Sequence, residues 1–277
     1  MNLINKYAEV IPRFEIEELL AYLFNCDKTD LYTKDLPVDR EIELLFDSLV
    51  LKRLAGEPLQ YIIGRTDFMG LDFRVQTGVF IPRPETELLV ANALSAISCQ
   101  LSQKTSVRIL DLCTGSGCIA ISLAKNIPAA EIIAIDISER ALDTARENAV
   151  IHNVAERIKF YKGDLFEGLV FDKKDKFDII VCNPPYIKNS DIGLLQLEVR
   201  QEPESALGGG TDGLEFYRQV SDHAPRYLKQ GCSIFLEIGA DQFQDVKDIF
   251  RTKSFYCLKG VKEDFAGIKR VIWIDLL

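Results

Sequence analysis

From about residue 85 onwards, short apolar runs rich in β-branched residues alternate with stretches of helical periodicity. Helical stretches separate the early runs, and this alternation is typical of a parallel sheet with helices on both faces. Two further strands are expected in the tail, at 255–258 and 271–274, where a polar loop joins them. The five main runs lie at 107–112, 131–137, 158–163, 177–182 and 232–238. Together these runs predict an α/β fold with a mainly parallel sheet of seven strands.

The beginning of the chain has apolar residues at helical rather than strand spacing. Two amphipathic helices are expected, over 14–24 and 39–54. Asp39 is suited to cap the second helix at its N-terminus, and Gly56 is suited to end it. The expected buried stripes are Ile16, Leu19, Leu20, Leu23 and Phe24 in the first helix, and Ile42, Leu45, Leu49 and Leu54 in the second. Because helices this short need a partner surface, the pattern indicates a small helical domain over 1–57.

A strand-like segment connects these two parts. Residues 60–64 and 68–75 have strand character, and each stretch contains a glycine that interrupts it. We therefore expect a β-hairpin linker over 58–84, followed by the α/β domain over 85–277. The linker ends in Ile81-Pro-Arg-Pro-Glu-Thr-Glu, whose two prolines stiffen the backbone.

Net charge narrows the class of partner. The chain has 277 residues, a formal net charge of -9 and a pI of about 5.0. An acidic protein is repelled by nucleic-acid phosphates, so direct nucleic-acid binding is not expected, whereas a basic protein partner fits. The sequence has no apolar stretch of about 18 residues and no signal-peptide pattern. These features predict a cytoplasmic protein with no membrane-spanning segment.

The cysteines and histidines argue against metal or nucleophilic chemistry. The seven cysteines form no C-x-x-C pair, so no metal site is expected. Cys182 is expected in the core rather than as a nucleophile. His152 is expected at a helix end or on the surface, and His223 in an ordinary helix. Mechanisms that depend on a Ser–His pair or on metal-bound histidine therefore have little support.

The strongest local motif is Ile109-Leu-Asp-Leu-Cys-Thr-Gly-Ser-Gly, in which an apolar strand ends in Asp111 and a glycine-bearing turn. Gly115 and Gly117 allow the backbone to approach a ligand, and doubly wound folds bind ligands beyond the carboxyl ends of their strands. The spacing is shorter than the G-x-G-x-x-G of dinucleotide enzymes. An acid here suits a ligand with a positive group or hydroxyls, such as S-adenosylmethionine. The alternative is a tight turn that binds nothing.

Two further strand ends carry acids. Asp136 follows an apolar strand about 20 residues after the glycines, where a carboxylate accepts ribose hydroxyls. The next strand ends in Asp164 and Leu165, an acid and an apolar residue that suit the edge of an adenine ring. Asp136 could instead cap the next helix, a role that Ser138 also fits, and Asp164 could be a loop aspartate. Three acids at three successive strand ends favour the ligand-binding interpretation.

The fourth strand ends in Asn183-Pro184-Pro185-Tyr186, in which two prolines fix an extended backbone. The Asn183 side-chain oxygen and the Pro184 carbonyl can accept the two hydrogens of one planar NH2 group, and Tyr186 offers a flat packing surface. Orientation of a poorly nucleophilic amide nitrogen can supply several kcal/mol, up to ~7–11 kcal/mol, so no strong base is required. The alternative is a proline-rich turn without chemistry. We therefore take Asn183, Pro184 and Tyr186 as candidate catalytic residues, and all four as candidate substrate-binding residues.

These residues together resemble the class I, Rossmann-like S-adenosylmethionine methyltransferases, and more closely the peptide chain release factor glutamine methyltransferases. The resemblance covers nearly the whole chain. It is carried by the segments Gly56-Glu-Pro-Leu-Gln-Tyr-Ile-Ile-Gly, Phe80-Ile-Pro-Arg-Pro-Glu-Thr-Glu, Asp111-Leu-Cys-Thr-Gly-Ser-Gly, Asn183-Pro-Pro-Tyr-Ile and Val199-Arg-Gln-Glu-Pro-Glu-Ser-Ala-Leu.

The resemblance implies an S-adenosylmethionine site along Cys113, Thr114, Gly115, Ser116 and Gly117, with Asp136, Leu165 and Asn183. It also implies that the substrate is the glutamine of the Gly-Gly-Gln tip of class 1 release factors, and that the helical domain contacts the factor. Cys113 departs from the family, whose members commonly have glycine there. A Cβ at that position is expected to be tolerated if its φ is negative.

Three other functions remain open from the sequence. One is methylation of a ribosomal-protein glutamine, against which the Pro82-Arg-Pro-Glu-Thr-Glu segment argues. Another is methylation of adenine in nucleic acid, which uses the same Asn-Pro-Pro-Tyr motif but needs a basic cleft or a base-reading domain. A third is a binding module without activity, against which the complete motif and the three acids argue.

Overall fold

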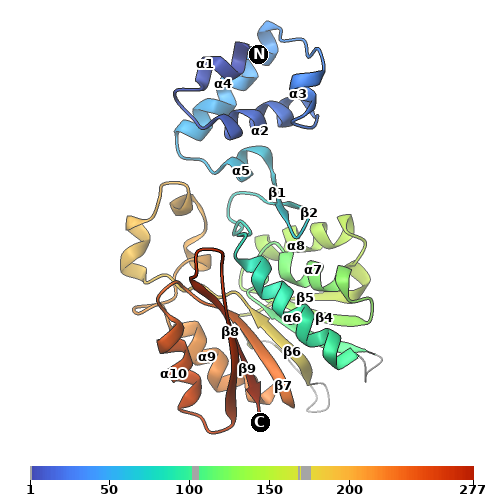
Figure 1. Ribbon diagram of the computed structural model, residues 1–277, viewed down its shortest axis with the longest axis vertical. Coiled ribbons are helices and arrows are strands. Elements are labelled where there is room, and N and C mark those ends of the chain that lie inside the picture. Colours follow the sequence, from blue (N-terminus) through green and yellow to red (C-terminus); the bar gives the residue numbers. More distant parts are fainter. Residues whose placement is uncertain (1, 102–105, 168, 170–175) are drawn as a thin grey trace. The chain divides into compact units, whose positions relative to one another are not determined.

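The computed structural model describes residues 2–101, 106–167, 169 and 176–277 (Figure 1). The chain divides into two compact units. The first unit consists of Met1–Arg65 and Gln196–Gln201, and the second of Thr66–Leu195 and Glu202–Leu277. The second unit therefore contains every strand end that the sequence singles out.

The first unit is helical. Its helices are α1 (Asn2–Tyr7), α2 (Arg13–Phe24), α3 (Asp30–Thr33), α4 (Arg40–Leu54) and α5 (Leu59–Ile63). The predicted stripe of α2 is confirmed, since Ile16, Leu19 and Leu20 are buried. Asp39 caps α4 as predicted, because its side chain accepts a hydrogen bond from Ile42 N at 2.9 Å.

The predicted buried face of α4 is only partly right, because Ile42 and Leu49 are half-buried and Leu49 packs against the helical core, but Leu45 and Leu54 do not. Phe46 and Val50 are fully buried, whereas Leu45 and Leu54 are 47% and 46% exposed. Helix α4 has apolar residues on most of its circumference, so more than one stripe satisfies helical spacing. The stripe with the phenylalanine removes the most apolar surface from water and takes the core position.

The predicted strand at 60–64 is also wrong, because this segment forms helix α5. Pro58 precedes the helix with a φ of -54°, and Gly64 ends it in the left-handed region with a φ of 75°. A proline before the first turn and a glycine after the last are the usual ends of a helix, and here they outweigh the β-branched residues between them. The hairpin is formed by β1 (Arg65–Phe68) and β2 (Leu71–Arg74). Its turn residues Met69 and Gly70 both have positive φ, as a two-residue hairpin turn of type I′ requires.

The second unit is built on the predicted seven-stranded sheet, whose order is β5-β4-β3-β6-β7-β9-β8. The first five strands in this order are parallel, and β9 is antiparallel to both β7 and β8. Strands β3 and β6 have the predicted bounds, while the last three strands are longer than predicted. The strands are β3 (Val107–Leu112), β4 (Ala130–Asp136), β5 (Ile158–Lys162), β6 (Phe177–Cys182), β7 (Leu228–Glu237), β8 (Tyr256–Glu263) and β9 (Lys269–Leu276).

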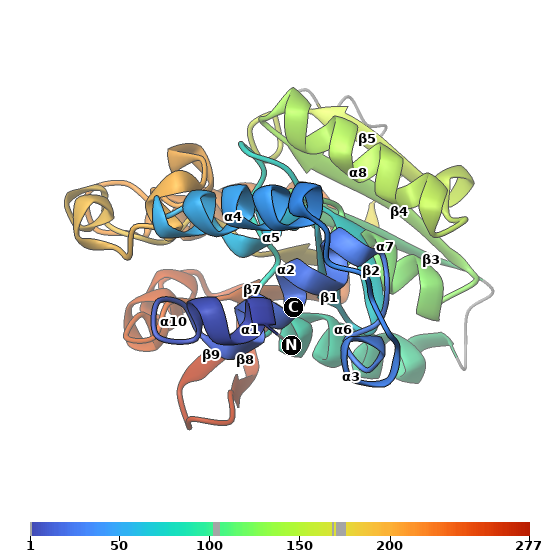
Figure 2. The same cartoon turned by 90° about the horizontal axis from the view of Figure 1, so that it is seen from above.

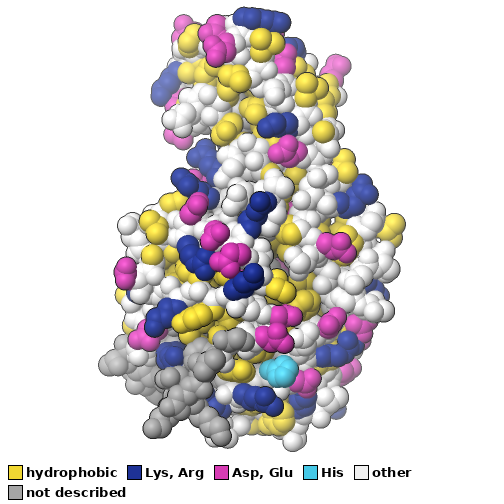
Figure 3. All heavy atoms as spheres, turned by 180° about the vertical axis from the view of Figure 1, so that it is seen from behind, with side chains coloured by type: hydrophobic (Ala, Val, Ile, Leu, Met, Phe, Trp, Pro, Cys, Tyr) yellow, Lys and Arg dark blue, Asp and Glu magenta, His cyan; other side chains and the backbone are white. Residues whose placement is uncertain are grey.

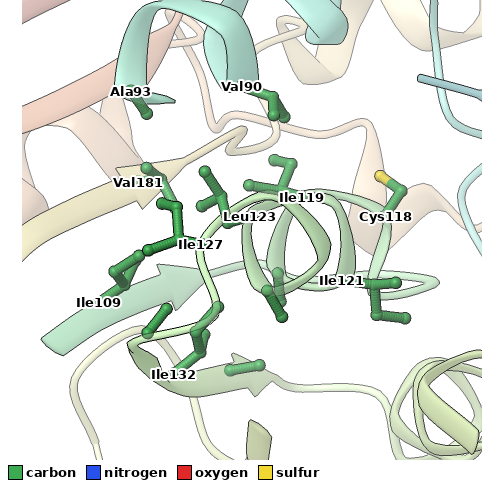
Figure 4. Close-up of a cluster of buried hydrophobic side chains, with 14 of the residues drawn as sticks. Val90, Ala93, Ile109, Cys118, Ile119, Ile121, Leu123, Ile127, Ile132 and Val181 are labelled. Atoms are coloured by element: carbon green, nitrogen blue, oxygen red, sulfur yellow. The ribbon is translucent and has the colours of Figure 1, made fainter. Parts of the chain in front are cut away.

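Helices pack on both faces of this sheet (Figure 2). Successive residues of a strand point to opposite faces, so Ile109 packs among the side chains of α6 and α7, and Leu110 packs with those of α9 and α10. Figure 4 shows Val90 and Ala93 of α6 directed towards Val181 of β6 and towards α7. The helices are α6 (Thr86–Leu101), α7 (Cys118–Asn126), α8 (Glu139–Ile151), α9 (Glu215–His223) and α10 (Phe243–Arg251). Short 3-10 turns lie at Ala155–Arg157, Asn189–Leu194, Val199–Gln201, Glu204–Ala206 and Ala224–Arg226.

The parallel strands bring the candidate residues to one edge of the sheet. Leu112 of β3 lies opposite Ile135 of β4 and Cys182 of β6 in the register. The loops that follow these strands therefore begin side by side, as ligand-binding loops do in doubly wound sheets.

Candidate active site

Asp111, at the end of β3, is a buried acid whose hydrogen bonding is incomplete. Thr114 Oγ1 donates to Asp111 Oδ2 at 2.6 Å, but Oδ1 has no partner within the described residues. The Ser116 hydroxyl in the same loop also lacks a partner there. Burial raises the pKa of Asp111 to about 7, and the Thr114 hydrogen bond opposes that rise. A buried acceptor without a partner is costly, so this loop is suited to a ligand that brings a cationic donor.

Asp136, at the end of β4, ties two loops together. Its Oδ2 accepts from Gly115 N at 2.8 Å, and its Oδ1 accepts from Ser138 N at 2.9 Å. Burial raises its pKa, while these backbone hydrogen bonds lower it. Ser138 is the residue that caps α8, so the alternative role of Asp136 as the cap is not needed. Each carboxylate oxygen keeps a further lone pair with which to accept a hydroxyl.

The turn between β3 and α7 leaves space in front of its backbone. A Cβ on Gly115 would meet no atom within 4 Å, whereas a Cβ on Gly117 would lie 3.0 Å from the side chain of Ala145. Both glycines have positive φ. Gly115 is thus open towards a ligand, and Gly117 allows α7 and α8 to pack closely.

Cys113 does not have the negative φ under which a Cβ is expected to fit at this position. Its φ is 60°, in the left-handed region, where a non-glycine residue costs roughly 1–2 kcal/mol. Its thiol lies against Cys182, and a hydrogen bond with Cys182 and burial raise the pKa of Cys113. A glycine would avoid this conformational cost, so this chain accepts strain at Cys113.

Gly163, Asp164 and Leu165 follow β5 as predicted. Leu165 is buried among the side chains on the α9 and α10 face of the sheet, with a φ of 50°, and Asp164 is half-buried. The pair therefore combines a buried apolar surface with an accessible acid.

The Asn183-Pro184-Pro185-Tyr186 segment is held from several sides. Gln242 Nε2 donates to Tyr186 O at 2.9 Å, which fixes the backbone after the prolines. Asn183 Nδ2 donates to Thr86 Oγ1 at 3.0 Å. Within the described residues, no hydrogen bond uses Asn183 Oδ1 or the Pro184 carbonyl. Two neighbouring acceptors are therefore available to a substrate donor.

Further residues, which the sequence does not single out, support this edge of the sheet. Thr86 Oγ1 donates to Glu237 Oε2 at 2.7 Å, and Glu237 is buried at the end of β7. Arg83 pairs with the buried carboxylate of Glu202, which also accepts from Ile81 N at 3.0 Å. The proline-containing motif therefore has specific polar partners and is more than a stiff connector. The signal was the polar Thr86 at the start of an apolar helix, but its partners lie far away in the sequence.

Cys182 and the two histidines lie where the sequence predicts them. Cys182 is fully buried, His152 ends α8 with Nε2 2.9 Å from Asp72 O, and His223 is the last residue of α9. The side chain of Cys99 lies outside the described residues. In the described part of the chain, no three His, Cys, Asp or Glu side chains are grouped to hold a metal ion. Over the same residues, no helix is both long and apolar enough to cross a bilayer.

Comparison with known proteins decides the family. Residues 74–201 match the Methyltransferase small domain, and residues 6–64 match the PrmC N-terminal domain. A "Release factor glutamine methyltransferase" of Thermodesulfovibrio yellowstonii is 41% identical over 278 residues, covering 98% of this chain and 97% of that protein. This chain belongs to the release factor glutamine methyltransferase family. Relatives with the same name from Geobacter sulfurreducens and Clostridium acetobutylicum are 40% and 38% identical, covering 94% and 92% of this chain and 88% of each relative.

Solved structures support the fold of the family. The hMettl16 catalytic domain in complex with the MAT2A 3'UTR hairpin 6 matches with a TM-score of 0.58 at 18% identity, over 79% of this chain and 80% of that one. The ribosomal protein L11 methylase of Lactobacillus delbrueckii subsp. bulgaricus matches with a TM-score of 0.51 at 17% identity, over 74% of this chain and 84% of that one. At these identities the likeness concerns the fold alone, and the predicted Rossmann-like methyltransferase architecture is confirmed.

Proposed function

We propose that this chain transfers a methyl group from S-adenosylmethionine to the side-chain amide nitrogen of the glutamine in the Gly-Gly-Gln motif of class 1 peptide chain release factors. The observation that carries the proposal is a pair of acceptors beyond the end of β6, Asn183 Oδ1 and the Pro184 carbonyl, that no hydrogen bond within the described residues uses. A side-chain amide has two N–H donors on one planar nitrogen, which such a pair matches. The names of the relatives support the choice of a release factor.

The residues of the β3–α7 turn fit the proposed cofactor. Asp111 Oδ1 and Ser116 Oγ lack partners within the described residues, and the space in front of Gly115 is open. We assign the cofactor to this turn, from Cys113 to Gly117, with the Asp136 carboxylate at the ribose. Asp164 and Leu165 would hold the adenine edge, and Asn183 would border the reacting end. When bound, S-adenosylmethionine supplies an electrophilic methyl group on a sulfonium.

The chain's own residues would act by orientation. Asn183 Oδ1 and Pro184 O would accept both amide hydrogens and so fix the plane of the substrate nitrogen. Tyr186 would pack its ring against the amide group, and the buried prolines would exclude water from it. The nitrogen would gain the methyl group as the sulfonium becomes a neutral thioether, and the strongly acidic proton of the methylated amide would be lost to solvent without a dedicated base. Correct placement alone can lower a barrier by several kcal/mol, up to ~7–11 kcal/mol.

The surface charge favours a protein substrate over nucleic acid. Acidic and basic side chains are interspersed on the face seen in Figure 3, and the net charge of the chain is -9. Proteins that bind nucleic acid usually gather Lys and Arg into one patch or stripe. We therefore favour glutamine methylation over adenine methylation, and the experiment that tests the proposal must be able to detect both.

Methyl transfer from radiolabelled S-adenosylmethionine tests the proposal directly. Purified release factor, ribosomes and duplex DNA are offered separately to the full chain at equal acceptor concentration. We expect label in the release factor at a rate at least tenfold above the other two. Label that enters ribosomes or DNA faster than release factor would overturn the assignment of substrate.

Replacing Asp136 with alanine is expected to weaken S-adenosylmethionine binding about tenfold to a hundredfold. Hydrogen bonds to a charged group contribute ~1.5–3 kcal/mol, and each 1.4 kcal/mol is tenfold in affinity. The variant also loses the tie to Gly115 N, so circular dichroism must show that the fold is retained. Asp143→Ala is a matched control, because Asp143 is an exposed acid on α8 that pairs with Arg146. Equal calorimetric affinity of Asp136→Ala and the control would remove Asp136 from the cofactor site.

A further inference from the structure

Three side chains from distant parts of the sequence form a hydrogen-bonded row at the candidate active site. Asn183 follows β6, Thr86 begins α6, and Glu237 ends β7. Asn183 Nδ2 donates to Thr86 Oγ1 at 3.0 Å, and Thr86 Oγ1 donates to Glu237 Oε2 at 2.7 Å. Only Asn183 belongs to the motif expected to touch the substrate, so the other two need a separate explanation.

The chemistry of the row fixes the direction of each hydrogen bond. An ionised carboxylate can only accept, so the single proton of the Thr86 hydroxyl goes to Glu237. The Thr86 hydroxyl can then only accept a hydrogen bond from Asn183. The NH2 group of the Asn183 amide, which is a donor, must therefore face Thr86. The opposite orientation would place two acceptor oxygens against each other at 3.0 Å. The Asn183 carbonyl oxygen must therefore point away from Thr86.

The row is rigid as well as directional. Thr86 and Glu237 are 1% and 2% exposed, and a β-branched side chain such as threonine has few rotamers. Cys182 lies opposite Leu236 where β6 pairs with β7, so Asn183 and Glu237 are held at adjacent strand ends. Within the described residues, the charged and titratable groups that interact with the Glu237 carboxylate are Glu85, Cys118, Tyr186, Tyr217 and Arg270.

We propose that Thr86 and Glu237 are positioning residues, which hold the Asn183 amide with its oxygen turned towards the methyl-accepting nitrogen. The inference rests on the proposed function, because it assigns Asn183 Oδ1 to a substrate N–H. In addition, the carboxylate of Glu237 sets the direction of both hydrogen bonds in the row. Neither positioning residue touches the reacting atoms in this account.

The positioning row makes turnover depend on pH. Burial raises the pKa of Glu237 to about 7, and the Thr86 hydrogen bond and the Arg270 charge oppose that rise. Below this pKa the carboxyl of Glu237 is protonated and can donate a hydrogen bond to Thr86. The Thr86 hydroxyl can then donate to Asn183 instead. That hydrogen bond favours the flipped Asn183 amide, with its oxygen facing Thr86. Turnover therefore rises as the pH increases through about 7 and is lost as it falls. Asp111 titrates in the same range, so turnover is measured with S-adenosylmethionine saturating at each pH.

Thr86→Val and Thr86→Ser form a matched pair that tests the hydroxyl. Valine keeps the shape of threonine and removes the hydrogen bonds, whereas serine keeps the hydroxyl. With release factor as substrate we expect Thr86→Val to lower kcat by about 100-fold, the scale of a small misplacement, with cofactor affinity changed less than about twofold. Thr86→Ser should retain kcat within about threefold. Equal turnover in the two variants, whether both are high or both are low, would overturn the proposal.

Two further measurements cover the case in which Thr86→Val folds poorly or the release factor is not the substrate. Glu237→Gln should lose the rise of turnover with pH near neutrality, and a profile identical to that of the unmodified chain would contradict the inference. Independently of any substrate, the Asn183 side-chain N–H that faces Thr86 should exchange slowly with deuterated water in the full chain and rapidly in Thr86→Val. Equal exchange in both would also overturn it. Absence of methylation by the unmodified chain would instead count against the proposed function.

Discussion

Turnover on release factor is expected to fall at least 100-fold when Asn183 is replaced with alanine. The change removes one of the two acceptors that would orient the substrate amide, and misplacement by about an ångström can cost ~100-fold. The change also removes the Asn183 amide N–H that donates a hydrogen bond to the Thr86 hydroxyl. Affinity for S-adenosylmethionine should fall much less, because most of the proposed cofactor contacts lie in the β3–α7 turn.

Asn126→Ala serves as the control for this experiment. Asn126 is exposed at the end of α7, and its amide donates to Ser122 O of its own helix. Single-turnover rates with both substrates saturating separate a defect in orientation from one in binding. If Asn183→Ala retained a rate close to that of Asn126→Ala, the orienting role of Asn183 would be wrong.

Removing the helical unit is expected to abolish efficient methylation of intact release factor without abolishing cofactor binding. A Gly-Gly-Gln tip buries little surface, so a second contact should supply affinity by raising the effective concentration of the tip, an effect of about 10²–10⁴-fold. We propose that the helical unit provides that contact. A chain that begins at Thr66, the first residue of the second unit, should bind S-adenosylmethionine and methylate release factor at least 100-fold more slowly.

A short Gly-Gly-Gln peptide provides the control, because it lacks any second contact. The full and truncated chains should methylate this peptide at similar, low rates, provided that circular dichroism shows a folded truncation. Residues 196–201 lose their partners in the truncation, since Arg53 pairs with Glu198 at 2.8 Å within the first unit. A Glu198→Gln variant of the full chain measures how much that loss alone contributes. A folded truncation that methylates intact factor as fast as the full chain would contradict a docking role for the helical unit.

The sheet could be predicted from sequence because each strand carries its own local signal. Buried parallel strands are continuous apolar runs, and those at 107–112 and 177–182 match β3 and β6 at both ends. Prediction failed where local signals competed. At 59–63 a proline and a glycine at the ends outweighed strand-forming isoleucines, and in α4 an apolar circumference allowed more than one buried face.

The candidate site could be predicted only where its residues follow parallel strands, whose carboxyl ends meet at one edge of the sheet. Strand ends of a parallel sheet share one edge, so Asp111, Asp136 and Asn183 could be grouped in advance. The contact between Thr86 and Glu237 spans 151 residues and has no local pattern. The positive φ of Cys113 was equally hidden, because a cysteine in a loop gives no sign of a left-handed backbone.

Mass spectrometry of the methylated substrate can locate the methyl group that this chain transfers. Release factor is incubated with the full chain and S-adenosylmethionine that carries a deuterated methyl group, then digested and sequenced by fragmentation. We expect a single labelled methyl group on the side-chain amide nitrogen of the Gly-Gly-Gln glutamine, formed at least 100-fold more slowly by Asn183→Ala. Label on any other residue, or an unlabelled factor beside labelled ribosomal protein or nucleic acid, would contradict it.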